Sequence, residues 1–131
     1  MAPAGARLDL SVGGGLVWVI DSSLGRVRGY VRSVLIVTGS IRARPDSIDQ
    51  VLALSLEHVR RSRQEPGCLL HSVHRDAEDP LRLVFLEHWA DADALRAHFR
   101  VPASGAFVNE ASALAASPAE MAIYDAQPAS L

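Results

Sequence analysis

Apolar and polar residues follow two different periods along the chain after residue 30. Residues 31–42 are rich in β-branched side chains and apolar on both faces, which predicts a strand covered on both sides. After this strand, apolar residues recur at the spacing of a helix up to Pro66-Gly67, where proline cannot continue the helix. Asp46 is the expected N-cap of this helix. The predicted apolar stripe consists of Ile48, Val51, Leu52, Leu56 and Val59.

The remaining segments complete an α+β pattern. Asp91 is expected to cap a short helix, Pro102 to break it, and the polar residues 76–80 to form a hairpin loop. The order βαββααβ predicts a ferredoxin-like fold with an antiparallel four-stranded sheet, in which the second helix is split in two. The further predicted strands are residues 68–75, 81–89 and 120–126, and the further predicted helices are residues 91–99 and 104–114.

Residues 1–30 differ from the rest of the chain. They contain six of the nine glycines and show no sustained period, although Leu8, Leu10 and Val12 alternate with other residues. Two interpretations remain open: a flexible extension, or an arm that packs on the domain or on a partner subunit and buries Trp18. The length of 131 residues favours one domain, which we place at residues 31–131.

The predicted sheet has more apolar surface than its own helices can cover. Two helices shield one face of a four-stranded sheet, but the other face is also apolar, with either Leu83 and Phe85 or Val84 and Leu86 pointing outward. An exposed patch of this size usually marks an interface, and a twofold homodimer is the commonest solution. We therefore expect a homodimer through the sheet face, that is, a dimeric α+β barrel.

Composition excludes several classes of function. A net charge of −2 gives no basic footprint for nucleic acid, and no segment reaches the roughly 18 apolar residues of a membrane helix. The single cysteine, Cys68, fits a cytoplasmic, reducing setting. The sequence shows no Cys/His cluster spaced for a metal, no dinucleotide fingerprint and no P-loop lysine, so we predict no metal and no cofactor.

Three short motifs resemble one known family. The chain carries Glu65-Pro66-Gly67-Cys68, Glu87-His88-Trp89 and Ala97-His98 in order, and over roughly residues 33–126 it resembles the antibiotic biosynthesis monooxygenases. The resemblance implies a small dimeric protein that oxygenates phenolic, anthrone or quinol substrates with O2, without metal, flavin or haem. Relatives in the same superfamily degrade haem or isomerise small molecules, so the fold alone does not fix the activity.

A base must remove the acidic proton of such a substrate, and histidine suits this role near neutral pH. His58 lies on the polar flank of the long predicted helix and is expected to face solvent. His71 and His74 point to opposite faces of their strand. By its spacing after Pro66-Gly67, His74 resembles the active-site histidine of the cofactor-free anthrone oxygenases, and Trp89 resembles their pocket tryptophan.

Other positions depart from characterised members of the superfamily. Phe85 stands where the anthrone oxygenases carry an asparagine, Leu95 where they carry a tyrosine, and Asn109 near the place of their arginine. His98 and Val108 stand near the tryptophan and histidine of haem-degrading relatives. These departures disfavour both anthrone and haem as substrates.

The leading hypothesis is a cofactor-independent monooxygenase that oxidises a small aromatic phenol or quinol with O2. Its pocket would lie between the sheet and the helices that carry His98 and Asn109. The predicted base is His74 or His98, and the predicted substrate-binding residues are Trp89, Phe85, Glu87 and Asn109.

Alternatives remain open at this point. Trp89 can serve packing alone, and Glu87 can pair with an arginine. The protein as a whole can be a non-catalytic dimeric module that binds a small metabolite, or an isomerase or lyase on the same fold.

Overall fold

The computed structural model describes residues 10–12, 16–21, 26–31, 33–129 and 131. Strands β1 (Leu10–Val12), β2 (Leu16–Asp21) and β3 (Arg26–Val31) form a three-stranded antiparallel sheet. Val31 thus ends β3, and the first strand of the main sheet starts at Val34 rather than at residue 31. The position of Leu8 and the burial predicted for Trp18 lie outside what the structure describes.

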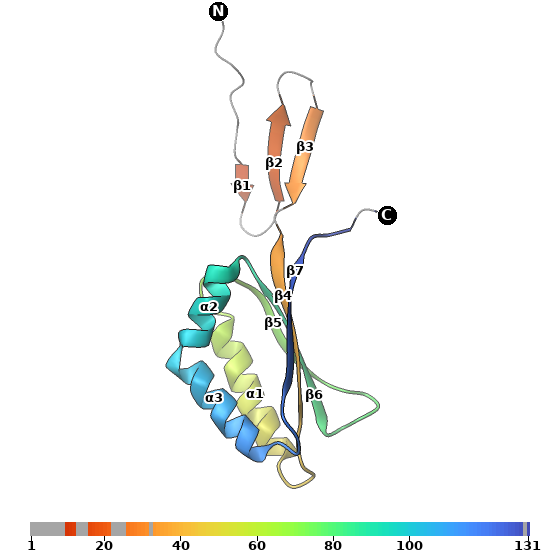
Figure 1. Cartoon of the computed structure of the whole chain (residues 1–131), viewed down its shortest axis with the longest axis vertical. Helices are drawn as coiled ribbons and strands as arrows, with labels where there is room; N and C mark the ends of the chain where they lie inside the picture. The colour runs from red at the N-terminus through yellow and green to blue at the C-terminus, as the bar shows by residue number, and fades with distance from the viewer. Residues whose placement is uncertain (1–9, 13–15, 22–25, 32, 130) are drawn as a thin grey trace, which may run out of the picture.

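The main domain has the predicted ferredoxin-like order, with all strands antiparallel in the order β5-β6-β4-β7. Figure 1 shows the three helices packed against one face of this sheet. The predicted split of the second helix is confirmed, and the second piece starts at Pro102 rather than at residue 104. The elements are β4 (Val34–Arg42), α1 (Ile48–Ser62), β5 (Cys68–Arg75), β6 (Arg82–Trp89), α2 (Ala92–Arg100), α3 (Pro102–Leu114) and β7 (Glu120–Ala126).

The buried face of α1 is rotated from the predicted stripe. His58 is buried, with 6% of its surface exposed, so the expectation that it faces solvent is wrong. Ser55 and Ser62 fit into this face because their hydroxyls donate to the carbonyl oxygens one turn earlier, at 2.6 and 2.7 Å, and leave no unpaired polar group. The buried residues of α1 are Val51, Ser55, His58, Val59 and Ser62.

One helix cap differs from the prediction and one agrees. Ser47, not Asp46, takes the N-cap position of α1, and its hydroxyl donates to the carbonyl oxygen of Leu114 at 2.7 Å. This bond ties the start of α1 to the end of α3. Asp91 caps α2 as predicted, since its carboxylate accepts from the backbone N–H of Ala94 at 2.8 Å.

The core lies between the sheet and the helices. Strand register places Leu83, Phe85 and Trp89 of β6 on this inner face, opposite Ile41, Gly39 and Leu35 of β4. Burial of large apolar side chains there supplies the main stabilisation of the domain. The buried apolar residues are Val37, Ile41, Ala43, Val51, Val59, Leu83, Phe85, Trp89, Leu95 and Ala111.

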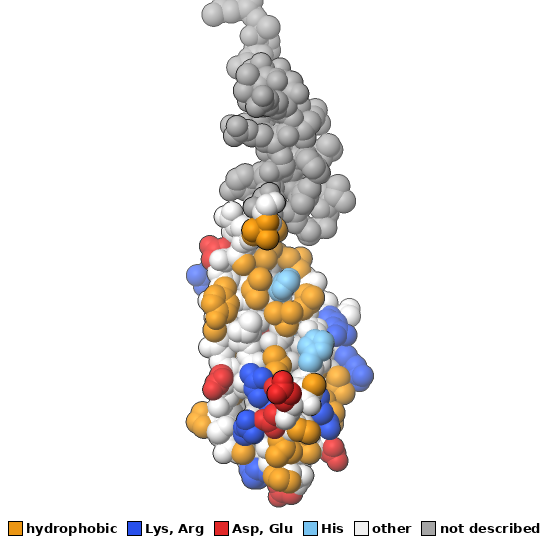
Figure 2. Space-filling view, turned by 90° about the vertical axis from the view of Figure 1, so that its right-hand side faces the viewer, with side chains coloured by type: hydrophobic (Ala, Val, Ile, Leu, Met, Phe, Trp, Pro, Cys, Tyr) orange, Lys and Arg blue, Asp and Glu red, His pale blue; other side chains and the backbone are white. Residues whose placement is uncertain are grey.

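The opposite, outer face of the sheet carries Val84 and Leu86, each half-buried, together with Leu70 (37% exposed) and Tyr124 (54% exposed). Figure 2 views this side and shows hydrophobic side chains gathered above a group of charged ones. None of the helices in the described part of the chain is long and apolar enough to span a membrane.

Candidate active site

A cavity of about 320 Å³ opens between the inner face of the sheet and the three helices. This volume lies in the range of small-molecule sites. Phe85 and Glu87 line it from β6, and His58, His98 and Asn109 line it from the helices. Its entrance is marked by three exposed apolar side chains, Phe99, Val108 and Met121.

The three sequence motifs meet beside this cavity. The Glu-Pro-Gly-Cys turn between α1 and β5 packs on α2, and Gly67 makes the contact possible. Its φ is +80°, and a Cβ atom at this position would lie 2.5 Å from the Cβ of Ala94. Only glycine accepts both this conformation and this approach. The turn thereby brings Glu65 to His98 on α2.

His98 and Glu65 form a buried pair. The ring Nδ1 of His98 lies 2.7 Å from Glu65 Oε2, and His98 is 4% exposed. A carboxylate oxygen accepts, so Nδ1 carries the proton of this bond and Nε2 of the neutral ring keeps a free lone pair. The second oxygen of Glu65 faces Arg61 Nε at 3.8 Å. The carboxylate therefore fixes both the orientation and the tautomer of His98.

Glu87 and Trp89 form a second pair. The indole Nε1 donates to Glu87 Oε2 at 2.7 Å, and among the described residues of this chain no arginine pairs with Glu87. Burial raises the pKa of the Glu87 carboxyl, opposed by this hydrogen bond and by His98. Trp89 is fully buried and stacks at a tilt on His98, with 4.7 Å between ring centroids. It supports the site from behind and does not line the cavity.

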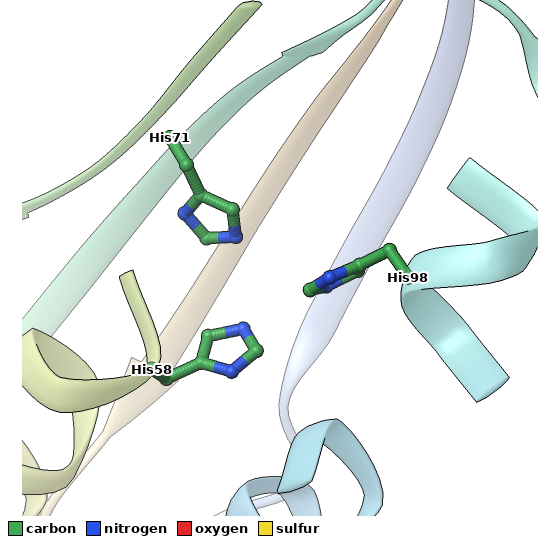
Figure 3. A group of neighbouring side chains, drawn as sticks. All are labelled: His58, His71 and His98. Atoms are coloured by element: carbon green, nitrogen blue, oxygen red, sulfur yellow. The ribbon is translucent and has the colours of Figure 1, made fainter. Parts of the chain in front are cut away.

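Three histidines from separate elements point toward one another (Figure 3). His58 of α1, His71 of β5 and His98 of α2 have ring centroids 5.1 to 5.7 Å apart. Burial is the main cause that lowers the pKa of His58 to about 3 and the pKa of His71 to about 4. Both rings are therefore neutral at pH 7.

The structure brings together four of the six predicted site residues. Phe85, Glu87, His98 and Asn109 line the same cavity. Trp89 lies just behind it. His74 is separate: it is exposed on the outer face of β5, where its Nε2 lies 3.0 Å from Ser72 Oγ.

Sequence reasoning missed Glu65, His58 and His71 as parts of the site. Only Glu65 carried a signal, as the first residue of the Glu-Pro-Gly-Cys motif. The histidines come from a helix and a strand whose packing no local spacing reveals.

Comparison with known proteins agrees with this fold. The family model described as antibiotic biosynthesis monooxygenase matches residues 34–110. A crystal structure described by the same words is similar, with 34% identity, a TM-score of 0.67, and coverage of 72% of this chain and 99% of that one. Rv0793 from Mycobacterium tuberculosis, at 21% identity and a TM-score of 0.70, covers 76% of this chain and 100% of its own and shows the same fold.

An uncharacterised protein of Synechocystis sp. is 37% identical over 90 residues, which are 69% of this chain and 61% of that protein. The match thus spans less than two thirds of the cyanobacterial protein. The family model, in contrast, matches more than half of the present chain. This chain belongs to the antibiotic biosynthesis monooxygenase family.

Proposed function

We propose that this protein is a monooxygenase that oxidises a small phenol- or quinol-type substrate with O2, without metal, flavin or haem, and that His98 is its base. The observation that carries the proposal is the Glu65–His98 pair at the wall of a small apolar cavity. The sequence carries no dinucleotide fingerprint, which agrees with a reaction whose electrons come from the substrate.

The reaction needs no external reductant. His98 Nε2 takes the proton of a ring hydroxyl, and the resulting anion is electron-rich enough to reduce O2. A carbon–oxygen bond forms, the O–O bond breaks, and one oxygen atom leaves as water. A quinol and O2 thus give a hydroxylated quinone and one water, with atoms and electrons balanced. Glu65 stabilises the imidazolium that forms on His98, because the pair is buried and its interaction is weakly screened.

The remaining lining residues suit a flat aromatic ring. Phe85 and Phe107 lie edge to face, with centroids 6.1 Å apart, and offer an aromatic wall. Asn109 on α3 and Glu87 on β6 supply polar groups that can orient a hydroxyl or carbonyl. Because burial raises the pKa of Glu87, its carboxyl is better suited than an exposed one to donate a proton to a substrate oxygen.

Oxygen uptake with simple quinols, combined with ¹⁸O2 labelling of the product, tests the proposal. We expect one labelled oxygen atom per product molecule and one O2 consumed per quinol. His98→Ala should lower kcat by about 100-fold or more, the usual contribution of a general base. The matched control is His88→Ala, a histidine paired with Ile36 and Leu70 on the outer sheet face, which should keep the wild-type rate.

Two results would overturn the assignment. One is wild-type protein that consumes no O2 above the spontaneous rate of quinol oxidation. The other is a variant His74→Ala that loses the rate while His98→Ala retains it. Thermal stabilisation by a quinol without turnover would favour the metabolite-binding alternative, and turnover without O2 would favour an isomerase or lyase.

We also propose that the protein is a homodimer through the outer face of its sheet. The support is the set of side chains that register places there, including Leu70, Val84, Leu86 and Tyr124, which the helices of the same chain do not cover. A cytoplasmic location remains our prediction, based on the single cysteine.

A further inference from the structure

We propose that His58, His71 and His98 together bind a divalent first-row transition metal ion such as Zn²⁺ or Co²⁺, and that this ion inhibits the enzyme. The metal site itself is independent of the proposed function. The inhibition rests on the proposed function, because a metal ion bound to His98 uses the same lone pair that the base requires.

The spacing of the three histidines is close to that of the ligands of one metal ion. One ring nitrogen from each histidine lies within 4.8 Å of the others, and all three side chains are buried. Zinc–nitrogen bonds of about 2.0–2.1 Å place tetrahedral ligands roughly 3.4 Å apart. The ligand nitrogens therefore have to approach one another by up to about 1.4 Å, which rotation of side chains can supply.

His71 is the strongest indication of a ligand. Its side chain is fully buried, and neither ring nitrogen has a hydrogen-bond partner among the described residues. A buried polar ring without a partner costs free energy that a ligand would recover. Its Nε2 lies 3.4 Å from Glu87 Oε1 in a direction that forms no hydrogen bond. Two ligands of one ion commonly have this separation, so Glu87 is a candidate fourth ligand.

The surroundings of His98 also suit a metal ligand. Its Nδ1 binds the carboxylate of Glu65 at 2.7 Å, as ligating histidines usually bind a carboxylate or carbonyl through their second nitrogen. Glu65 and Glu87 bring two carboxylates to the site. Imidazole nitrogens with a carboxylate suit zinc, cobalt, nickel, copper or iron better than calcium or magnesium.

Arg61 opposes metal binding, so its removal is expected to increase the affinity for the metal ion. One of its N–H groups donates to His58 Nδ1 at 2.9 Å, which in the neutral ring leaves the proton on Nε2. Ligation through Nε2 requires that proton to move to Nδ1 and Arg61 to turn away. Arg61 also donates to Ser104 Oγ at 2.9 Å, so a second partner is already in place.

The experiment uses the full chain, freed of any histidine tag and treated with chelator, titrated with Co²⁺. We expect one Co²⁺ per chain, visible absorption bands of a four- or five-coordinate ion, and displacement by Zn²⁺. His71→Phe should weaken binding by at least about tenfold. The control His88→Phe makes the same substitution on the outer face and should leave binding unchanged. Arg61→Met should tighten binding of Co²⁺. Because a damaged fold does not increase the affinity for a metal ion, this variant tests the site independently of folding.

The outcomes separate this inference from the proposed function. Absence of Co²⁺ binding at millimolar concentration, binding that survives His71→Phe, or weaker binding in Arg61→Met overturns the metal site. Co²⁺ binding in a protein without O2 uptake leaves the site standing and removes the oxygenase. If the protein oxidises quinols, one equivalent of Zn²⁺ should abolish O2 uptake and chelator should restore it. Uptake that is insensitive to bound Zn²⁺ overturns the shared use of His98.

Discussion

The site is built from polar side chains that are costly to bury singly and are kept in the core as pairs. Glu65 holds His98, Trp89 holds Glu87, and Arg61 holds His58. In each pair, one polar atom of the held side chain forms the hydrogen bond. A second atom of that side chain stays directed toward the cavity or the histidine cluster. His71 stands apart, because its ring is buried without a hydrogen bond in the described part of the chain. The chemistry we propose depends on these free atoms.

The buried histidines predict a loss of stability in acid. Their folded-state pKa values, about 3 for His58 and about 4 for His71, lie below the ordinary value of 6.5. As the pH falls below 6.5, the two histidines bind protons in the unfolded chain but stay neutral in the folded chain. The stability that these histidines contribute is therefore complete above pH 6.5 and falls as the pH drops toward 4. Urea unfolding at pH 7, 6 and 5 should show a decreasing free energy of unfolding.

The variant His71→Gln should make this decrease shallower, since it removes one of the two groups. His74→Gln is the matched control, because His74 is an exposed histidine on the same strand. A pH dependence that is identical in wild type and His71→Gln would contradict the assignment.

At the scale of elements, the turn between α1 and β5 is the least replaceable part of the domain. Gly67→Ala should cost about 2 kcal/mol or more, the sum of a left-handed residue with a side chain and of overpacking against Ala94. Gly105→Ala is the control: it lies in α3, and a Cβ atom there would meet no neighbour within 4 Å, so it should be neutral or stabilising by up to about 1 kcal/mol. Thermal or urea unfolding measures both, and equal effects would contradict the argument.

The elements themselves could be predicted from the sequence because their signals are local. The strands at residues 68–75 and 120–126 agree with β5 and β7 at both ends. The cap at Asp91 and the break at Pro102 are visible for the same reason. The error in α1 has a physical cause: serine is small and can satisfy its own hydroxyl, so a helix can turn Ser55 and Ser62 inward and carry His58 with them.

The candidate site was predictable in part. Glu87 and His98 follow from the sequence motifs, Asn109 follows from its place near the arginine of the anthrone oxygenases, and all three line one cavity. Spacing after Pro66-Gly67 favours His74 over His71, but spacing cannot tell which face of a strand the helices will cover. That choice is made by tertiary packing, and it decides which histidine of β5 meets the cluster.

The whole molecule should be a dimer whose interface is the outer sheet face. Leu86→Asp places a charge at the centre of this face, since Leu86 pairs with Thr38 and Ser72 of the neighbouring strands. We expect a shift from dimer to monomer, measured by light scattering coupled to gel filtration. The control Ala53→Asp adds the same charge to the exposed side of α1 and should remain dimeric. A wild-type monomer at micromolar concentration would contradict the proposed interface.

The three exposed apolar residues at the entrance, Phe99, Val108 and Met121, have a consequence for evolution and for engineering. Exposed side chains can usually be exchanged at a cost within about 0.5 kcal/mol, whereas changes in a close-packed core are felt at once. Selection can therefore reshape the rim while the Glu65–His98 pair stays untouched. A library of variants restricted to these three positions would change which molecules enter the cavity without altering the Glu65–His98 pair.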